Sequence, residues 1–163
     1  MGPSKSWAGI LSRDRAAAQP DPHPATAMVH MDGFRFMSSV LPWRSCGPAW
    51  QGGTLADKLR VTLTVLRPFV DQETVWGGDW NQALEGPEHV GSLEGRQQVL
   101  ELIGESKLSV PTSSLASAAT GHRAVDHIAV PLTWDVDAAC RVAASAGPRR
   151  LSDHDAYMVS VDD

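Results

Sequence analysis

The chain has 163 residues, of which 42% are hydrophobic and 20% are charged, and its formal net charge is −5. This length and composition predict one soluble globular domain, 1–163, in which we expect residues 1–6 to be disordered. The acidic balance excludes a protein that binds nucleic acid through bulk positive charge, although a local patch or a metal ion can still bind phosphate. No apolar run approaches the roughly 20 residues that span a bilayer, and no signal peptide follows the start.

The two cysteines, Cys46 and Cys140, favour two reduced thiols over a single disulfide, which is typical of a cytosolic protein. We therefore expect a cytoplasmic protein that makes no membrane contact.

In chain order, a short apolar piece at residues 7–11 leads into a proline-rich loop at 20–24. A hairpin is expected next, because Asp32-Gly33 supplies a tight turn between two strand-like runs. Leucines and a valine at steps of three and four predict an amphipathic helix over residues 55–70, with Thr54 as its N-cap. A second helix is expected after Ser92 and closes near Gly104.

Three further strands are expected at residues 74–78, 124–131 and 156–161. Strands interleaved with helices indicate an α/β or α+β layered domain.

Polar residues stand at the ends of these three strands. Asp79 and Asn81 follow the first strand, Asp126 and His127 lie within the second, and the run Ser152-Asp153-His154-Asp155 precedes the third. If the sheet brings these ends together, several acids surround an imidazole. Such a cluster suits Mg²⁺, which prefers carboxylate oxygen, and it also suits proton transfer by a histidine and an aspartate.

Each motif alone has a simpler interpretation. The run "GDWN" is composed of turn formers, and a single histidine in a strand is usually structural. A zinc site at His127, Asp153 and His154 is a further alternative, but the spacing matches no closed zinc pattern.

Together and in this order, "GGDWN", "VDHIAVP" and "LSDHDAYMVSV" resemble the endonuclease/exonuclease/phosphatase superfamily, the DNase I-like metal-dependent phosphoesterases. The resemblance covers residues 7–161, with "GILSR" similar to an early strand of that family. It implies a four-layer α/β sandwich, in which two sheets pack face to face and helices lie outside. The active site is then expected at one end of the sheets.

The resemblance also implies roles for individual residues. Asp79 would activate the attacking water and bind metal, and Asn81 would hold a phosphate oxygen. His154 would stabilise the transition-state charge, with Asp126 fixing its tautomer. Asp153 would bind or orient Mg²⁺ or Mn²⁺, while His127 and Ser152 would support these groups. Arg44 would bind substrate phosphate, since a guanidinium can do so bidentately.

The chain departs from the family pattern at its beginning. The strand that carries the family's asparagine and the region that carries its metal-binding glutamate have no counterpart here, and the first glutamate of the chain is Glu73. The resemblance therefore implies a member that lacks its N-terminal portion. A sandwich without its first strands exposes a sheet edge and an apolar face, so we expect possible self-association through that edge.

Three functional hypotheses remain at this stage. The first is an active phosphoesterase or phosphodiesterase of nuclease type, acting on a phosphate ester that the resemblance leaves open among DNA, RNA, a phospholipid head group and an inositol phosphate. The second is a catalytically impaired member of the same fold that acts as a binding module or has no activity. The third is an unrelated α/β domain, and convergence of Asp79, Asp126 and His154 would separate the first two from it.

Overall fold

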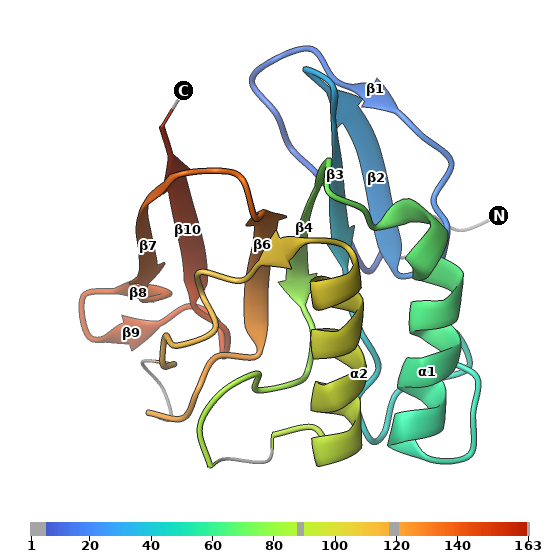
Figure 1. Cartoon of the computed structure of the whole chain (residues 1–163). Helices are drawn as coiled ribbons and strands as arrows, with labels where there is room; N and C mark the ends of the chain where they lie inside the picture. Colours follow the sequence, from blue (N-terminus) through green and yellow to red (C-terminus); the bar gives the residue numbers. More distant parts are fainter. Residues whose placement is uncertain (1–5, 88–89, 118–120, 163) are drawn as a thin grey trace, which may run out of the picture.

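A computed structural model describes residues 6–87, 90–117 and 121–162. The expectation for residues 1–6 therefore lies outside the described part of the chain, except at Ser6. The largest element is a six-stranded sheet in the order β1-β2-β3-β4-β6-β5 (Figure 1). Its strands are β1 Ala17–Ala18, β2 Thr26–Met31, β3 Phe34–Ser39, β4 Thr74–Asp79, β5 Leu108–Ser109 and β6 Asp126–Pro131. Neighbouring strands are antiparallel except β3 and β4, which run in parallel.

The predicted hairpin is present and its turn has the expected geometry. Strands β2 and β3 pair over their full length and are joined by Asp32 and Gly33 alone. Both turn residues have positive φ values, 51° and 84°, as a two-residue turn with the twist of the flanking strands requires. Aspartate and glycine tolerate this region far better than other residues, which explains why this dipeptide marks the turn.

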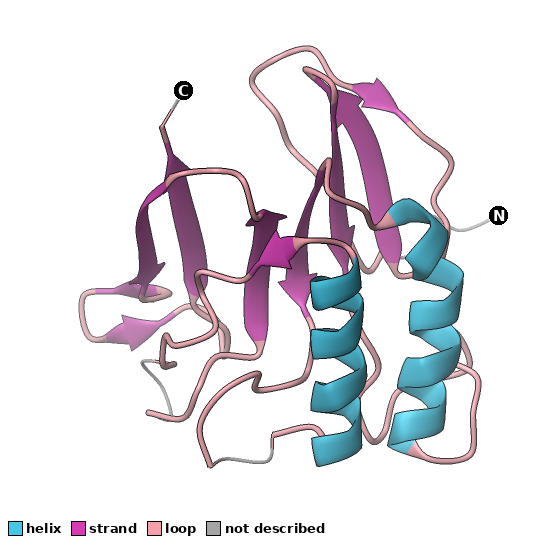
Figure 2. Cartoon of the chain, in the orientation of Figure 1, coloured by secondary structure: helices cyan, strands magenta, loops and turns pink. Residues whose placement is uncertain are grey.

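Two helices cover one face of the sheet. Helix α1 spans Leu55–Leu66, and helix α2 spans Leu93–Glu105; they lie side by side (Figure 2). Thr54 and Ser92 cap them as predicted, each accepting a backbone hydrogen bond from the third residue of its helix. The first helix is shorter than expected because it gives way to a 3₁₀ turn, η1 Arg67–Phe69, in which Pro68 cannot continue the α-helical hydrogen bonding.

The core lies between these helices and the sheet. Met37, Trp76 and Ala129 are register partners on β3, β4 and β6, and all three are buried in one cluster with the inner faces of both helices. Because successive residues of a strand point to opposite faces, their neighbours Phe36 and Val75 belong to the other face. These neighbours are only half-buried, so the sheet is well covered on the helix side.

A second pair of strands lies beside β6. Strand β7 Val136–Val142 pairs with β10 Ala156–Val161 in antiparallel fashion, and β10 contacts β6. A small hairpin, β8 Ser145–Ala146 with β9 Arg149–Arg150, lies in the connection between them. The sequence analysis predicted β10 but missed β7, whose central "DAAC" carries no strand-forming run.

The mixed α/β class is confirmed, with one layer of helices on a multistranded sheet. The expectation that "GILSR" forms a strand is wrong, because residues 6–16 contain no strand. Strand hydrogen bonds need a paired neighbour, and this segment has none in the described part of the chain. Within that part, no helix is both long and apolar enough to cross a bilayer.

Candidate active site

The polar strand ends converge at one end of the sheet, where β4 ends and β6 begins. Asp79 closes β4, Asp126 opens β6, and the two are direct register partners on adjacent strands. His154 comes from the loop before β10. Ligand atoms of Asp79, Asp126 and His154 all lie within 4.8 Å of one another. This is the convergence that the sequence analysis required for a DNase I-like member and that an unrelated α/β domain would not require.

His154 and Asp126 form a hydrogen-bonded pair. Nδ1 of His154 lies 2.8 Å and 3.0 Å from the two carboxylate oxygens of Asp126, so the ring donates its Nδ1 proton to the carboxylate. The backbone N–H of His154 donates to Oγ of Ser152 at 3.1 Å, which fixes the loop that carries the ring. With Nδ1 engaged, Nε2 is left as the reactive nitrogen on the opposite edge of the ring.

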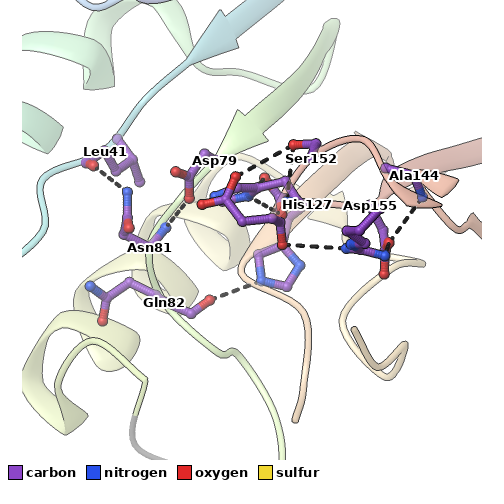
Figure 3. A network of polar contacts seen from close by, with 12 residues as sticks. Leu41, Asp79, Asn81, Gln82, His127, Ala144, Ser152 and Asp155 are labelled. Carbon is purple, nitrogen blue, oxygen red and sulfur yellow. Dashed lines mark hydrogen bonds and ion pairs between the residues drawn. The ribbon is translucent and has the colours of Figure 1, made fainter. Parts of the chain in front are cut away.

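Asp79 and Asn81 form a tight turn at the exit of β4 (Figure 3). The backbone N–H of Asn81 donates to Oδ1 of Asp79 at 3.0 Å, and Asn81 adopts a positive φ of 52°, which asparagine tolerates. Nδ2 of Asn81 donates to the carbonyl of Leu41 at 2.9 Å, and the N–H of Leu41 donates to the carbonyl of Asp79. The amide therefore ties Asn81 to Leu41, and the Asn81 side chain also hydrogen-bonds Asp79.

The electrostatics of the three residues differ from those of free side chains. Burial, reinforced by the charge of Asp126, raises the pKa of Asp79 to about 6. Burial also raises the pKa of Asp126, against the opposing effect of His154. For His154, burial acts to lower the pKa, but the hydrogen bond that the ring donates to Asp126 and the charges of Asp126 and Asp79 outweigh it, so the pKa is raised. The site therefore holds two close carboxylates beside an imidazole whose pKa is raised.

Two cavities open on either side of Asp126. One, of about 210 Å³, lies beside His154 and the other, of about 240 Å³, lies beside Asp79. Both share Asp126, Asp155 and Tyr157 in their walls. The first is also lined by Val90, Ser117, His122, Arg123, Val125 and Asp153. The cluster therefore has room for a substrate around it.

Two predicted site residues are not brought into this cluster. Asp153 is exposed and lines the cavity beside His154, but it is not a member of the three-residue group. Arg44 is exposed on the loop after β3, three residues beyond Leu41. His127 points to the opposite face from Asp126, where it is buried; desolvation lowers its pKa to about 4.

Sequence reasoning assigned no role to three groups that shape the site. Gln82 is fully buried, and its backbone carbonyl accepts a hydrogen bond from Nε2 of His127 at 2.9 Å. The Asp155 carboxylate is fully buried against Arg150, at 2.6 Å, and the N–H of Ala144. Tyr157 lines both cavities. The adjacency of Gln82 to Asn81 and of Asp155 to His154 was the only available signal.

No family model matches this chain, and no curated protein matches it by sequence. Solved structures do resemble it. An AP endonuclease from Archaeoglobus fulgidus superimposes with a TM-score of 0.63 at 16% identity over 86% of this chain and 66% of its own. The 3′ phosphatase NExo from Neisseria, bound to a product DNA hairpin, superimposes with a TM-score of 0.65 at 14% identity. The match covers 88% of this chain and 66% of the NExo chain.

The endonuclease domain of TRAS1, a telomere-specific non-LTR retrotransposon, gives a TM-score of 0.58 at 14% identity over 93% of this chain and 71% of that domain. The chain thus spans about two thirds of the length of the structures it resembles. At these identities the likeness concerns the fold, and it covers nearly all of this chain. The protein therefore has a DNase I-like fold.

Proposed function

We propose that this protein is a metal-dependent phosphodiesterase of nuclease type. The observation that carries the proposal is the convergence of Asp79, Asp126 and His154 at one end of a DNase I-like sheet, with His154 hydrogen-bonded to Asp126. A buried carboxylate of raised pKa beside a carboxylate-bound histidine, next to two cavities, is an arrangement suited to acid–base chemistry on an anionic substrate.

Asp79 aligns the attacking water and accepts its proton. In the metal-free protein a pKa of about 6 lies close to neutral pH, so the carboxylate is mostly ionised there and can accept a proton. Its Oδ1 atom is held by the N–H of Asn81. This contact fixes the direction in which the carboxylate faces the water.

His154 stabilises the charge that develops on the phosphoryl group. Its raised pKa keeps the ring protonated at neutral pH more fully than an ordinary histidine. Because Nδ1–H is held by Asp126, Nε2–H is directed away from that carboxylate and donates to a phosphoryl or leaving-group oxygen. The amide group of Asn81 and, at a greater distance, Arg44 bind further phosphate oxygens.

The donor set fits a hard divalent cation. Asp79 and Asp126 are two partly buried carboxylates; burial and, after it, the charge of Asp126 raise the pKa of Asp79, and a bound cation relieves the repulsion between the two groups. We propose Mg²⁺ or Mn²⁺, held by Asp79 with Asp126, and with Asp153 as an outer ligand. When bound, the ion supplies neutralisation of charge on the phosphoryl oxygens.

Nucleic acid is the proposed substrate. One of the similar structures, the 3′ phosphatase NExo, is described as bound to a product DNA hairpin. Here Arg123 lines the cavity beside His154 and supplies a positive charge among the carboxylates of Asp126, Asp153 and Asp155, in a chain of net charge −5. We propose a cytoplasmic location as well, since both cysteines are unpaired thiols in the structure.

Hydrolysis of plasmid DNA and of a 5′-labelled oligonucleotide, with Mg²⁺, Mn²⁺ or EDTA, tests this function. Metal-dependent cleavage is expected, and His154→Ala should reduce its rate by on the order of 100-fold or more. The matched control is His30→Ala, an exposed histidine on β2, which should stay within about twofold. A folded protein that cleaves nothing under any metal condition would overturn the enzymatic proposal and favour the impaired member that binds without cleaving.

Self-association is a second proposal, supported by the outer surface of the β7–β10 pair. Met158 and Val142 are 52% and 46% exposed there, and in the described part of the chain β10 pairs with β7 alone. An exposed apolar strand edge is a template for pairing with another chain. Light scattering after gel filtration should show a dimer that Met158→Lys weakens, whereas a strict monomer at all concentrations contradicts the proposal.

A further inference from the structure

Strand β6 presents two adjacent side chains to two different parts of the site. Asp126 faces His154, as described above. The next residue, His127, points to the helix-covered face and is 1% exposed. Successive side chains of a strand point to opposite faces of the sheet, so Asp126 and His127 must face opposite ways. The imidazole of His127 therefore lies behind the turn that carries Asp79 and Asn81.

We infer that His127 is a positioning residue for this active site: by donating from Nε2 to the carbonyl of Gln82, it holds the Asp79–Gln82 turn, and hence the Asp79 carboxylate, in its working orientation. The inference rests on the proposed function, since it assigns a role within the same site. His127 touches no reacting group and acts only through the turn.

The hydrogen bond defines the tautomer and direction of the ring. A carbonyl oxygen can only accept, so at 2.9 Å Nε2 must carry the proton. In the neutral ring Nδ1 is then a bare acceptor, and within the described residues it has no hydrogen-bond partner. The contact to Gln82 is therefore the one polar interaction for which this buried ring is oriented.

The contact to His127 is one of the hydrogen bonds that fix the turn, together with those from the N–H of Trp80 to the carbonyl of Val125 and from the N–H of Ala83 to the carbonyl of Val90. At the near end, Asp79 and Asn81 are tied to Leu41. At the far end, the side chain of Gln82 accepts a hydrogen bond from the N–H of Ser92 at 3.0 Å, while its backbone carbonyl is bound to His127. A buried carbonyl without its donor is costly, so loss of the imidazole should release or shift the turn.

Neighbouring residues pack closely around Gln82 and His127. A side chain at Gly91 or Gly95 would collide with Oε1 of Gln82, since an added Cβ would lie 2.2 Å or 2.7 Å from it. Trp80 packs on the other side, with its ring 5.3 Å from the His127 ring. Gln82 is thus enclosed between α2 and β6, and a displacement there is transmitted to Asp79 three residues earlier. Misplacement of a catalytic group by about 1 Å can cost on the order of 100-fold in rate.

The test compares His127→Met, which removes the donor, with His127→Gln, whose amide nitrogen can replace Nε2. In a metal-dependent cleavage assay, His127→Met should lower kcat at least about tenfold with KM within about twofold, and His127→Gln should recover kcat to within about threefold of the original chain. A purely structural role for the ring would affect both variants alike and would not separate kcat from KM.

Amide hydrogen exchange supplies a readout that needs no turnover. His127→Met should lower the protection of the Asn81 and Ala83 amides at least about tenfold, leave Met37 on β3 unchanged, and be reversed by His127→Gln. Unchanged protection of the turn in His127→Met, or equal loss across the whole sheet in both variants, would overturn the inference. If the original chain shows no cleavage, the exchange result still decides the role of His127, and only the proposed function fails.

Discussion

The helix-covered sheet and the β7–β10 pair differ sharply in packing, although both contribute to the same site. In the first, Trp76, Leu59 and Leu102 are at most 1% exposed and belong to one continuous cluster. In the second, every residue of β7 and β10 is half-buried or exposed, and Met158 is 52% exposed. Asp79 and Asp126 lie on the well-packed part, whereas His154 enters from the open part. The His154–Asp126 hydrogen bond therefore joins regions of unequal stability.

The largest expected effect is a core truncation in the well-packed region. Trp76 is fully buried, lies 4.4 Å from Trp80 between ring centroids and donates from Nε1 to Oγ of Ser39. Trp76→Ala should lower the free energy of unfolding by about 4 kcal/mol, through lost burial and the cavity left behind. Urea denaturation measures this, with Met158→Ala on β10 as the matched truncation.

Met158→Ala should lower the free energy of unfolding by less than about 1 kcal/mol, because about half of the Met158 side chain is already exposed to water in the folded protein. Equal losses for the two variants would contradict the contrast between the regions and would indicate that the outer face of β10 is covered in solution.

A smaller effect is expected from Asp155, which anchors the open pair. Its carboxylate is fully buried against Arg150 and the N–H of Ala144, and it follows His154 directly. Asp155→Asn should lower the free energy of unfolding by about 3 kcal/mol, because the guanidinium of Arg150 then loses the carboxylate that neutralises its charge. Hydrogen exchange should show lower amide protection in β7 and β10 and unchanged protection in β3 and β4. Uniform loss over both regions would mean that they unfold as one unit.

Asp79 gives a pH-dependent effect on stability. Its folded-state pKa of about 6 lies above the ordinary value of 3.8, so the folded chain binds this proton more tightly than the unfolded chain does. The resulting stabilisation is complete below pH 3.8 and is lost as the pH rises through about 6. Asp79→Asn is neutral at every pH and keeps an oxygen for the N–H of Asn81. In EDTA above pH 6.5, it should therefore be more stable than the original chain by about 2 kcal/mol, discounted for partial solvent access.

Thermal unfolding at pH 4 and pH 7 measures this difference, which should be near zero at pH 4. Mg²⁺ or Mn²⁺ should stabilise the original chain and not Asp79→Asn. The exposed Asp137→Asn on β7 is the matched control and should show no such pH dependence. A variant that is less stable than the original chain at pH 7 would contradict the raised pKa.

Local signals predicted much of the fold. The Asp32-Gly33 turn, the Thr54 and Ser92 caps and the strand containing Trp76 each follow from a few neighbouring residues, and all are present. β7 was missed because alanines and a cysteine carry little strand preference; pairing with β10 determines its conformation. The prediction of a strand at "GILSR" was wrong for the opposite reason: the local sequence is strand-like, but a run of this kind forms no strand without a neighbouring strand to pair with.

The site was predictable only where the resemblance fixed the order of motifs. The proximity of Asp79, Asp126 and His154 was expected from that order. Contacts between a side chain and a distant backbone, such as His127 to Gln82 or Asn81 to Leu41, leave no pattern in one sequence. They depend on register and on which face of β6 a residue occupies, and both are set by tertiary pairing.

The smallest expected effect concerns the cap of α2, which also supports the site. Oγ of Ser92 accepts from the N–H of Gly95 at 2.9 Å, and Ser92→Ala removes this contact at a cost of about 1 kcal/mol. The backbone N–H that binds Gln82 is retained, so cleavage should change by less than about twofold. Ser160→Ala, an exposed serine on β10, should cost less than about 0.5 kcal/mol. If Ser92→Ala instead lowers kcat tenfold with little loss of stability, the cap itself orients Gln82, and the turn is held from the helix side as strongly as from β6.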